Sequence, residues 1–242
     1  MRIIQITDLH IGTPEERPFD IDIRANFVRI LKAVKAIPHD LLVISGDLCL
    51  NEGDPAIYQW IKQQLDDFQL NYLVIPGNHD DKEMMVDVFD LRRELKNETL
   101  FFTSAANQLP LVLLDSGPGR VDEITLQLLR DYLQAHPSPI CLFMHHPPLK
   151  MGVPYMDKRY ALRDAGPLLA VLTEHPYPIS IFTGHYHVEK SVRWQNLDIH
   201  VTPSCYFQID WRKEHFAVDH HRIAYRYLDW DGETLQHAVV YP

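Results

Sequence analysis

The sequence predicts an α/β protein, with an α+β second part, built on two β-sheets. In residues 1–182, short apolar runs alternate with longer amphipathic stretches, which is the pattern of parallel strands joined by crossover helices. From about residue 190 onward, short alternating runs are joined by turns such as Asp231-Gly232, as is typical of antiparallel strands. No repeat, low-complexity segment or Gly/Ser linker divides the chain. We therefore expect one domain over residues 1–242, whose second half completes a second sheet.

Each expected element rests on its own periodicity. Apolar, β-rich runs predict strands over residues 2–7, 40–45, 72–75, 111–114, 140–144 and 179–182. Apolar positions at helical spacing predict helices over residues 22–37, 55–68, 82–95, 122–135 and 161–174. Pro38 ends the first helix, while Asp54 and Pro55 give the second an N-cap and a favourable first residue. In the antiparallel part we expect strands over residues 191–194, 199–202, 223–228 and 235–241.

Composition limits the class of protein. With 46% hydrophobic and 23% charged residues, the chain has the composition of an ordinary globular protein. The net charge of −10 argues against general binding to nucleic acid or anionic membranes, although a local metal charge would still allow a small phosphorylated substrate. No apolar run approaches the roughly 20 residues that span a bilayer, and the start lacks a signal-peptide cleavage site. Cys49, Cys141 and Cys205 are widely spaced and suit a reducing compartment, so we expect a cytoplasmic protein.

Polar residues gather where the predicted strands end. The motifs that follow predicted strands are "DLH" (8–10), "GD" (46–47), "GNHD" (77–80), "HHPP" (145–148) and "GHYH" (184–187). Ligands of open α/β sheets bind at the carboxyl ends of the strands. Similar short patterns at 53–54, 198–200 and 219–221 close no strand of the alternating series. The signal is therefore the ordered set and not any single motif.

The chemistry follows from the residue types in these motifs. Two aspartates, four histidines and one asparagine are too many donors for one tetrahedral site, but they suit two metal ions that share a bridging carboxylate. Two ions about 3.5–4 Å apart can grip both oxygens of a phosphoryl group and lower the pKa of a water molecule. His185 and His187 project to the same side of an extended segment, which favours a metal site over core packing.

Each residue also has an ordinary interpretation. Alone, Asp8 would be a turn or cap residue, Asp47 a turn residue, and His145 a satisfied loop histidine. His146 points in a different direction from its neighbour, so we expect it to have a supporting or structural role. Asp80 is either an orienting partner of the site or the N-cap of the helix over residues 82–95.

In these five motifs the sequence resembles the calcineurin-like metallophosphoesterase superfamily, over residues 8–187. The resemblance implies an enzyme with a four-layer α-β-β-α sandwich, two central mixed β-sheets and two metal ions. The metal ligands that it implies are Asp8, His10, Asp47, Asn78, His145, His185 and His187, with Asp47 as the bridge. His79 and Asn78 would contact the substrate, and His79 would stabilise charge or protonate the leaving oxygen. A hydroxide between the metals would be the nucleophile.

The segments "HHPPLKMG" and "TPSCYFQID" and the end of the chain are similar to those of bacterial class III cyclic nucleotide phosphodiesterases and related glycerophosphodiesterases. This resemblance implies hydrolysis of 3′,5′-cyclic nucleotides such as cyclic AMP, or of similar small phosphodiesters. Manganese or iron is the expected metal, with zinc, cobalt and magnesium as alternatives. The alternative substrates are a glycerophosphodiester, a phosphomonoester or a nucleotide-linked lipid pyrophosphate, and the least favoured alternative is a degenerate metal-binding scaffold.

Two further features stay open at this stage. A homo-oligomer is an alternative to a monomer, because such sites often gain substrate contacts from loops or from a neighbouring subunit. Residues 13–20, which are rich in proline and charge and follow His10, form either a loop over the site or an exposed connector.

Overall fold

The first sheet gathers strands from both ends of the chain in the computed structural model, which describes residues 1–104 and 109–242. Across the sheet the strands are β14 (Leu235–Val240), β13 (Tyr225–Trp230), β1 (Arg2–Ile6), β2 (Leu41–Ser45) and β3 (Tyr72–Ile75). β1, β2 and β3 run parallel to one another, whereas β13 runs antiparallel to β1 and β14 antiparallel to β13. The N-terminal strand is therefore a central strand, held on one side by a strand from near the C-terminus.

The second sheet is formed by the middle of the chain. Across it the strands are β4 (Leu95–Lys96), β5 (Thr99–Ser104), β6 (Leu111–Leu114), β7 (Ile140–Phe143), β8 (Ile179–Thr183), β10 (Leu197–Val201) and β9 (Lys190–Trp194). β6, β7, β8 and β10 run parallel, while β5 and β9 are antiparallel to their neighbours. A separate antiparallel pair is formed by β11 (Gln208–Ile209) and β12 (Val218–His220).

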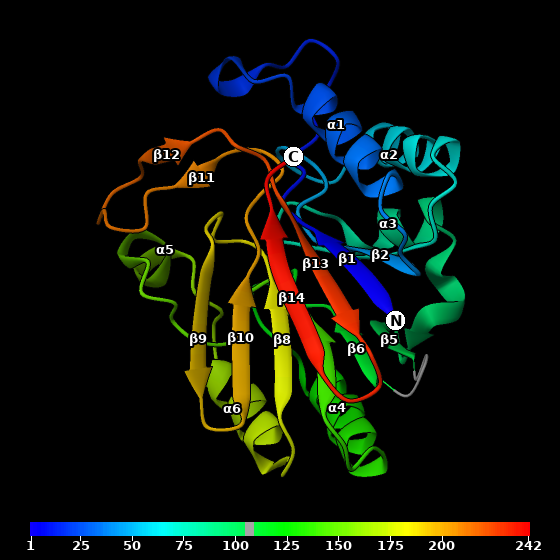
Figure 1. Cartoon of the computed structure of the whole chain (residues 1–242), viewed down its shortest axis with the longest axis vertical. Coiled ribbons are helices and arrows are strands. Elements are labelled where there is room, and N and C mark those ends of the chain that lie inside the picture. The colour runs from blue at the N-terminus through cyan, green and yellow to red at the C-terminus, as the bar shows by residue number, and fades with distance from the viewer. Residues whose placement is uncertain (105–108) are drawn as a thin grey trace.

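Helices flank the two sheets. α1 (Ile23–Lys35), α2 (Pro55–Asp67) and α3 (Lys82–Val88) lie beside the first sheet, and α4 (Glu123–Ala135) and α6 (Ala165–Glu174) beside the second (Figure 1). β2, β6 and β7 are buried along their whole length, as expected for strands covered on both faces. The predicted fold class, a four-layer sandwich with two mixed sheets, is confirmed, whereas the prediction of one domain over residues 1–242 stays a prediction. In the part of the chain that the structure describes, no helix is long and apolar enough to cross a membrane.

A buried polar network joins the facing sides of the sheets. The Gln5 side-chain amide in β1 donates to the Thr183 carbonyl of β8 (3.3 Å) and accepts a hydrogen bond from the Thr202 hydroxyl (2.6 Å). Arg226 of β13 donates in turn to the Thr202 hydroxyl (2.8 Å) and to the Val201 carbonyl (3.0 Å). Because these groups are buried and mutually satisfied, the network fixes the register of one sheet against the other.

Local capping explains where three of the predicted helices begin. Asp22, Asp54 and Asp122 precede α1, α2 and α4, and each carboxylate accepts a hydrogen bond from a backbone N–H of the first turn. The predicted helix over residues 82–95 is wrong in its second half, because Asp90 adopts a left-handed backbone (φ 58°) that separates α3 from the 3-10 turn η2 (Leu91–Glu94). The predicted helix over residues 161–174 begins later, after Asp164, which is also left-handed (φ 50°).

Several short elements were not predicted. They are the β4–β5 hairpin, the β11–β12 pair, the helix α5 (Pro154–Arg159) and the 3-10 turn η1 (Pro18–Asp20). The strand predicted over residues 199–202 corresponds to β10, which is antiparallel to β9 but parallel to β8. The antiparallel prediction is therefore right for the β10–β9 pair and wrong for the β10–β8 pair. The reason is that β9 lies at the edge of the sheet, and the chain returns from it to form β10 between β8 and β9.

Candidate metal centre

The loops after strands β1, β2, β3, β7 and β8 bring the predicted side chains together. The groups of ligand atoms that lie within 4.8 Å of one another are Asp8–His10–His187, His10–Asp47–His79 and Asp47–His145–His185. His10 and Asp47 each belong to two groups, so the three groups form one continuous cluster. Its members come from both sheets.

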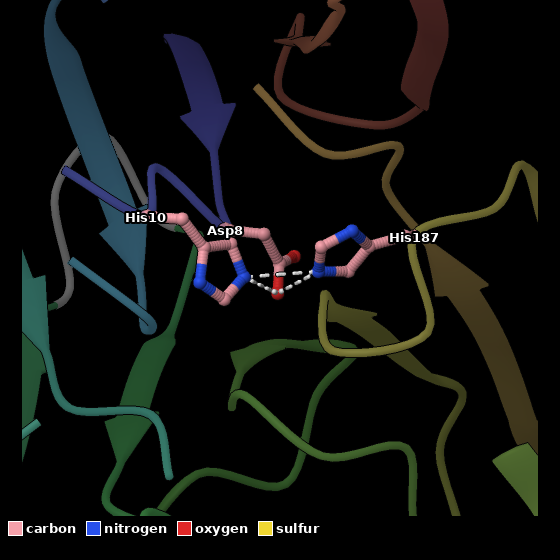
Figure 2. A group of neighbouring side chains, drawn as sticks. All are labelled: Asp8, His10 and His187. Carbon is pink, nitrogen blue, oxygen red and sulfur yellow. Dashed lines mark hydrogen bonds and ion pairs between the residues drawn. The ribbon is translucent and has the colours of Figure 1, made fainter. Parts of the chain in front are cut away.

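The first group surrounds the Asp8 carboxylate (Figure 2). His187 Nε2 lies 3.3 Å from Asp8 Oδ1 and 3.0 Å from His10 Nε2, and the three side chains converge on one point. His187 Nδ1 donates to the Phe207 carbonyl (3.1 Å), so Nε2 is the atom that it can offer to a metal ion. Burial lowers the pKa of His10 to about 3, so its imidazole is neutral and has a lone pair to offer.

The Asp47–His145–His185 group contains a buried nitrogen that lacks a hydrogen-bond partner. His145 Nδ1 donates to the Ser45 carbonyl (2.9 Å), while its buried Nε2 has no hydrogen-bond partner and lies 3.3 Å from Asp47 Oδ2. A buried polar atom without a partner costs about 1–3 kcal/mol, which a bound cation would remove. His185 Nε2 donates to the Tyr160 carbonyl (2.8 Å), so Nδ1 is the atom that it can offer to a metal.

Electrostatics at Asp47 also call for a positive charge. Burial would raise the pKa of Asp47, but His145 and His10 hold that pKa well below its usual range, so the carboxylate is ionised. Burial would likewise lower the pKa of His145, yet Asp47 raises it to about 9. A divalent cation between them would meet the same need without a proton. The donor set therefore fits metal ions.

The backbone of the cluster is held in an uncommon conformation. The five left-handed residues of the cluster are Asp8 (φ 54°), His10 (φ 48°), Asp47 (φ 53°), His185 (φ 68°) and His187 (φ 49°). Each such residue costs about 1–2 kcal/mol relative to ordinary backbone geometry. The cost is borne because hydrogen bonds fix the loops: the Asp8 carboxylate accepts from the His185 N–H (3.0 Å), and Asp47 Oδ1 accepts from the His79 N–H (3.0 Å).

Two glycines let these loops approach one another. A Cβ atom at Gly77 would overlap the Asp47 carboxylate and backbone, and a Cβ atom at Gly184 would overlap Thr7 and Asp8. The glycine of "GNHD" is therefore required by close approach and not by its φ angle.

The remaining predicted site residues line the same cleft. Asn78 is exposed and His79 is half-buried, and both face a cavity of about 390 Å³ together with His10 and His187. His79 Nδ1 donates to the Asn51 carbonyl (2.7 Å), and its ring lies 4.9 Å from that of His10. These positions place His79 beside the cluster with its Nε2 edge available to a substrate.

His146 has the supporting position that its sequence context predicted. Its ring is buried, pairs with the Ser116 hydroxyl (3.2 Å) and packs 4.2 Å from the ring of His185. The interpretation of Asp80 as the N-cap of α3 is wrong. The N-cap of α3 is Asp81, which accepts from the Met84 N–H (2.9 Å).

Asp80 instead fastens two loops of the site. Its carboxylate accepts hydrogen bonds from the N–H groups of Leu48 (3.1 Å), Cys49 (3.2 Å) and Gly77 (2.9 Å) and from the Tyr58 hydroxyl (3.1 Å). The loop that carries Asp47 is thereby tied to the loop that carries Asn78. Sequence alone left this role and helix capping open for Asp80, because either of two adjacent aspartates could have capped the helix.

Comparison with known proteins defines the class. The sequence model of the family described as "Calcineurin-like phosphoesterase" matches residues 1–189, and the chain belongs to this family. The predicted superfamily and the predicted enzyme class are confirmed.

Relatives of similar length carry more specific names. A Fibrobacter succinogenes protein named "probable cyclic nucleotide phosphodiesterase" is 33% identical over all of this chain and 93% of its own. The Escherichia coli 3′,5′-cyclic adenosine monophosphate phosphodiesterase CpdA is 28% identical, over 90% of this chain and 81% of its own. The glycerophosphodiester phosphodiesterase GpdQ of Enterobacter lignolyticus is also 28% identical, over 88% of this chain and 81% of its own.

Solved structures agree on the fold. A dimetal phosphatase from Danio rerio superposes with a TM-score of 0.70 at 11% identity, covering 99% of this chain and 98% of its own. A purple acid phosphatase from yellow lupin gives a TM-score of 0.69 at 12% identity, over 99% of this chain and 51% of its own. At such low identity these matches concern the fold alone.

Proposed function

We propose that the protein is a dinuclear-metal phosphodiesterase that hydrolyses 3′,5′-cyclic nucleotides such as cyclic AMP, or similar small diesters. The observation that carries the proposal is the opening of the metal-ligand cluster into a cleft with little other positive charge. Among the described residues that line this cleft, none is a lysine or an arginine. A diester has one negative charge at its phosphate, whereas a monoester has about two. A site with few cations besides its metals therefore favours the diester.

Asp8, His10 and His187 would hold one ion, Asn78, His145 and His185 the other, and Asp47 would bridge them. When bound, the ions would supply a water of lowered pKa and neutralise charge on the phosphoryl oxygens. Manganese or iron is the proposed metal, because carboxylate ligands suit manganese and imidazole ligands suit iron. Zinc, cobalt and magnesium are the alternatives that elemental analysis would distinguish.

His79 would act on the substrate from the rim of the cluster. Because a carbonyl oxygen only accepts, the hydrogen bond to Asn51 fixes a proton on His79 Nδ1. Nε2 is then the atom that faces the cleft, where in the protonated ring it can donate to a phosphoryl oxygen or to the leaving oxygen. The exposed Asn78 amide beside it would orient the phosphate.

Two wider proposals concern the substrate and the location of the protein. The partner of the site is a small phosphodiester, and its scissile bond lies inside the cleft. Cys49, Cys141 and Cys205 are free and buried, which supports a reducing cytoplasmic location. A homo-oligomer and the single domain over residues 1–242 remain predictions.

A substrate panel with metal-reconstituted protein tests the function. We expect cyclic AMP to be hydrolysed faster than glycerophosphoethanolamine, a phosphomonoester or a nucleotide-linked lipid pyrophosphate. The second candidate is a glycerophosphodiesterase, because the chain is as similar to the GpdQ relative as to CpdA, with 28% identity to each. If the glycerophosphodiester turns over quickly and cyclic AMP is inert, the second candidate replaces the first.

The bridging role of Asp47 has a matched control. Asp47→Asn should lower kcat/KM by about 100-fold or more and reduce the metal content found by elemental analysis. Asp54 also follows a glycine, but it caps α2 by accepting from the Ala56 N–H (2.7 Å). Because asparagine caps a helix as well as aspartate does, Asp54→Asn should leave both quantities unchanged. Wild-type turnover by Asp47→Asn at matched metal content would rule out the two-metal mechanism.

A further inference from the structure

A wall of aromatic side chains continues the cleft beyond the metal-ligand cluster. We define this aromatic wall by Phe19, Tyr155, Tyr206, Phe207 and Phe216, all of which line the cleft that contains His10 and His187. The five residues come from four separate parts of the chain: the turn η1, the helix α5, the segment before β11, and the connection between β11 and β12.

The rings form a continuous path away from the cluster. The ring of His187 lies 5.0 Å from that of Phe207, and Phe207 lies 5.3 Å from Phe19 and 5.8 Å from Phe216. Phe216 in turn lies 5.9 Å from Tyr155. These spacings are those of ordinary aromatic packing. A group that entered the cleft beside the phosphate would therefore meet ring faces and edges first.

The outer members of the wall are unusually exposed for their type. Phe19 is 53% and Phe216 40% exposed, whereas Tyr206 and Phe207 beneath them are buried. Phe19 also has a left-handed backbone (φ 55°), which is a strained conformation for a bulky residue. Strain and exposed apolar area both cost stability, and both are typical of positions kept for ligand contact.

The size and charge of the cleft restrict what the wall can bind. A cavity of about 390 Å³ lies at the small-molecule end of binding sites, so it suits one substrate and not a polymer. With no lysine or arginine among the described lining residues, the far end of the cleft suits an uncharged, planar group. The hydroxyls of Tyr155 and Tyr160, 3.4 Å apart at the mouth, could hydrogen-bond to the edge of such a group.

We propose that the aromatic wall binds the nucleobase of a nucleotide diester while the phosphate lies at the metal cluster. This inference rests on the proposed phosphodiesterase function and narrows its substrate class to nucleotides. Any of the bases can stack on an aromatic ring. The wall therefore selects nucleotides over glycerol diesters without distinguishing strongly between bases. Phe19 and Phe216 are the specificity-determining residues, because they are the most exposed rings of the aromatic wall.

The test compares two diesters on one variant. Phe216→Ala should raise the KM for cyclic AMP about fivefold or more, the lower end of what a stacking contact contributes, and leave KM and kcat for glycerophosphoethanolamine within about twofold. Phe216→Tyr, which keeps the ring, should restore the wild-type KM. Trp211→Ala is the matched control, because Trp211 is a similarly exposed aromatic (45%) between β11 and β12 that is not among the residues lining the cleft.

A binding measurement separates this inference from the proposed function. Adenosine, which has a base and no phosphate, should bind the metal-free protein in a calorimetric or saturation-transfer NMR titration, and Phe216→Ala should weaken that binding about fivefold. If neither diester is hydrolysed, the phosphodiesterase proposal fails, but adenosine binding that depends on Phe216 still supports the wall. Equal losses on both diesters, or adenosine binding that Phe216→Ala does not change, would overturn it.

Discussion

Asp115 is a buried carboxylate whose replacement by asparagine should stabilise the protein at neutral pH. Its side chain accepts a hydrogen bond from the Gly117 N–H (2.7 Å), and burial raises the pKa of Asp115 from 3.8 to about 6. The folded protein therefore holds this proton more tightly than the unfolded chain does. The resulting stability is fully present below about pH 4 and is lost as the pH rises through 6.

The magnitude follows from the size of the shift. One pKa unit corresponds to about 1.4 kcal/mol, so a shift from 3.8 to about 6 corresponds to about 3 kcal/mol at pH 8. Asparagine keeps an oxygen to accept the Gly117 N–H and has no charge to bury. We expect Asp115→Asn to increase the free energy of unfolding by about 2–3 kcal/mol at pH 8, and by nothing measurable at pH 4.

Urea unfolding of metal-free protein at pH 4, 6 and 8 would measure this difference. Asp22→Asn is the control, because Asp22 is an exposed N-cap of α1 that accepts from the Ala25 N–H (2.9 Å), a role that asparagine fills equally well. A stability gain that is the same at all three pH values, or a loss at pH 8, would refute the electrostatic reasoning.

Three further predictions concern the site. Asp80→Ala removes the carboxylate that holds two loops of the site together, so we expect metal affinity in titrations to fall about 10- to 100-fold. The N-cap variant Asp81→Asn should leave metal affinity unchanged, and equal effects of the two variants would contradict the proposed role of Asp80. Gly77→Ala places a methyl group against the Asp47 carboxylate, so metal content and turnover should both fall, and a fully active variant would show that the loops can separate freely. Removal of the metal by a chelator should lower the melting temperature in calorimetry by roughly 5–10 °C. The reason is that a metal ion at 100 times its Kd stabilises the folded state by about 2.7 kcal/mol. An unchanged melting temperature would mean that no ion binds the folded state.

Sequence could predict the cluster because its logic is local and repeated. Each side chain of the cluster lies within a few residues of a strand end, and parallel strands present their carboxyl ends at one edge of a sheet. The starts of α1, α2 and α4 were equally readable, because an aspartate caps each of them within its own first turn.

Other features depend on contacts that no short window contains. The ring of His146 is placed by Ser116, thirty residues away in sequence, and the carboxylate of Asp80 by a loop thirty-two residues away. The aromatic wall joins four segments with no shared periodicity, so no pattern in the sequence connects its residues. The β4–β5 hairpin could not be predicted, because the helical pattern of the sequence continues up to residue 95. In the structure the helix ends earlier, where Asp90 adopts a left-handed backbone.

The order of strands in the first sheet has a consequence for how the protein is made. β1 is synthesised long before its neighbour β13, whose Leu228 pairs with Ile3, and the Asp8 carboxylate waits for an N–H donor 177 residues later. At about 5–20 residues per second, translation needs roughly 11–45 s to pass from Ile3 to Leu228. During this interval the edge of β1 is open to pairing with other chains. We therefore expect nascent chains that stall before β13 to aggregate or to occupy chaperones, and the cluster to form only after the loop that follows β8 has been synthesised.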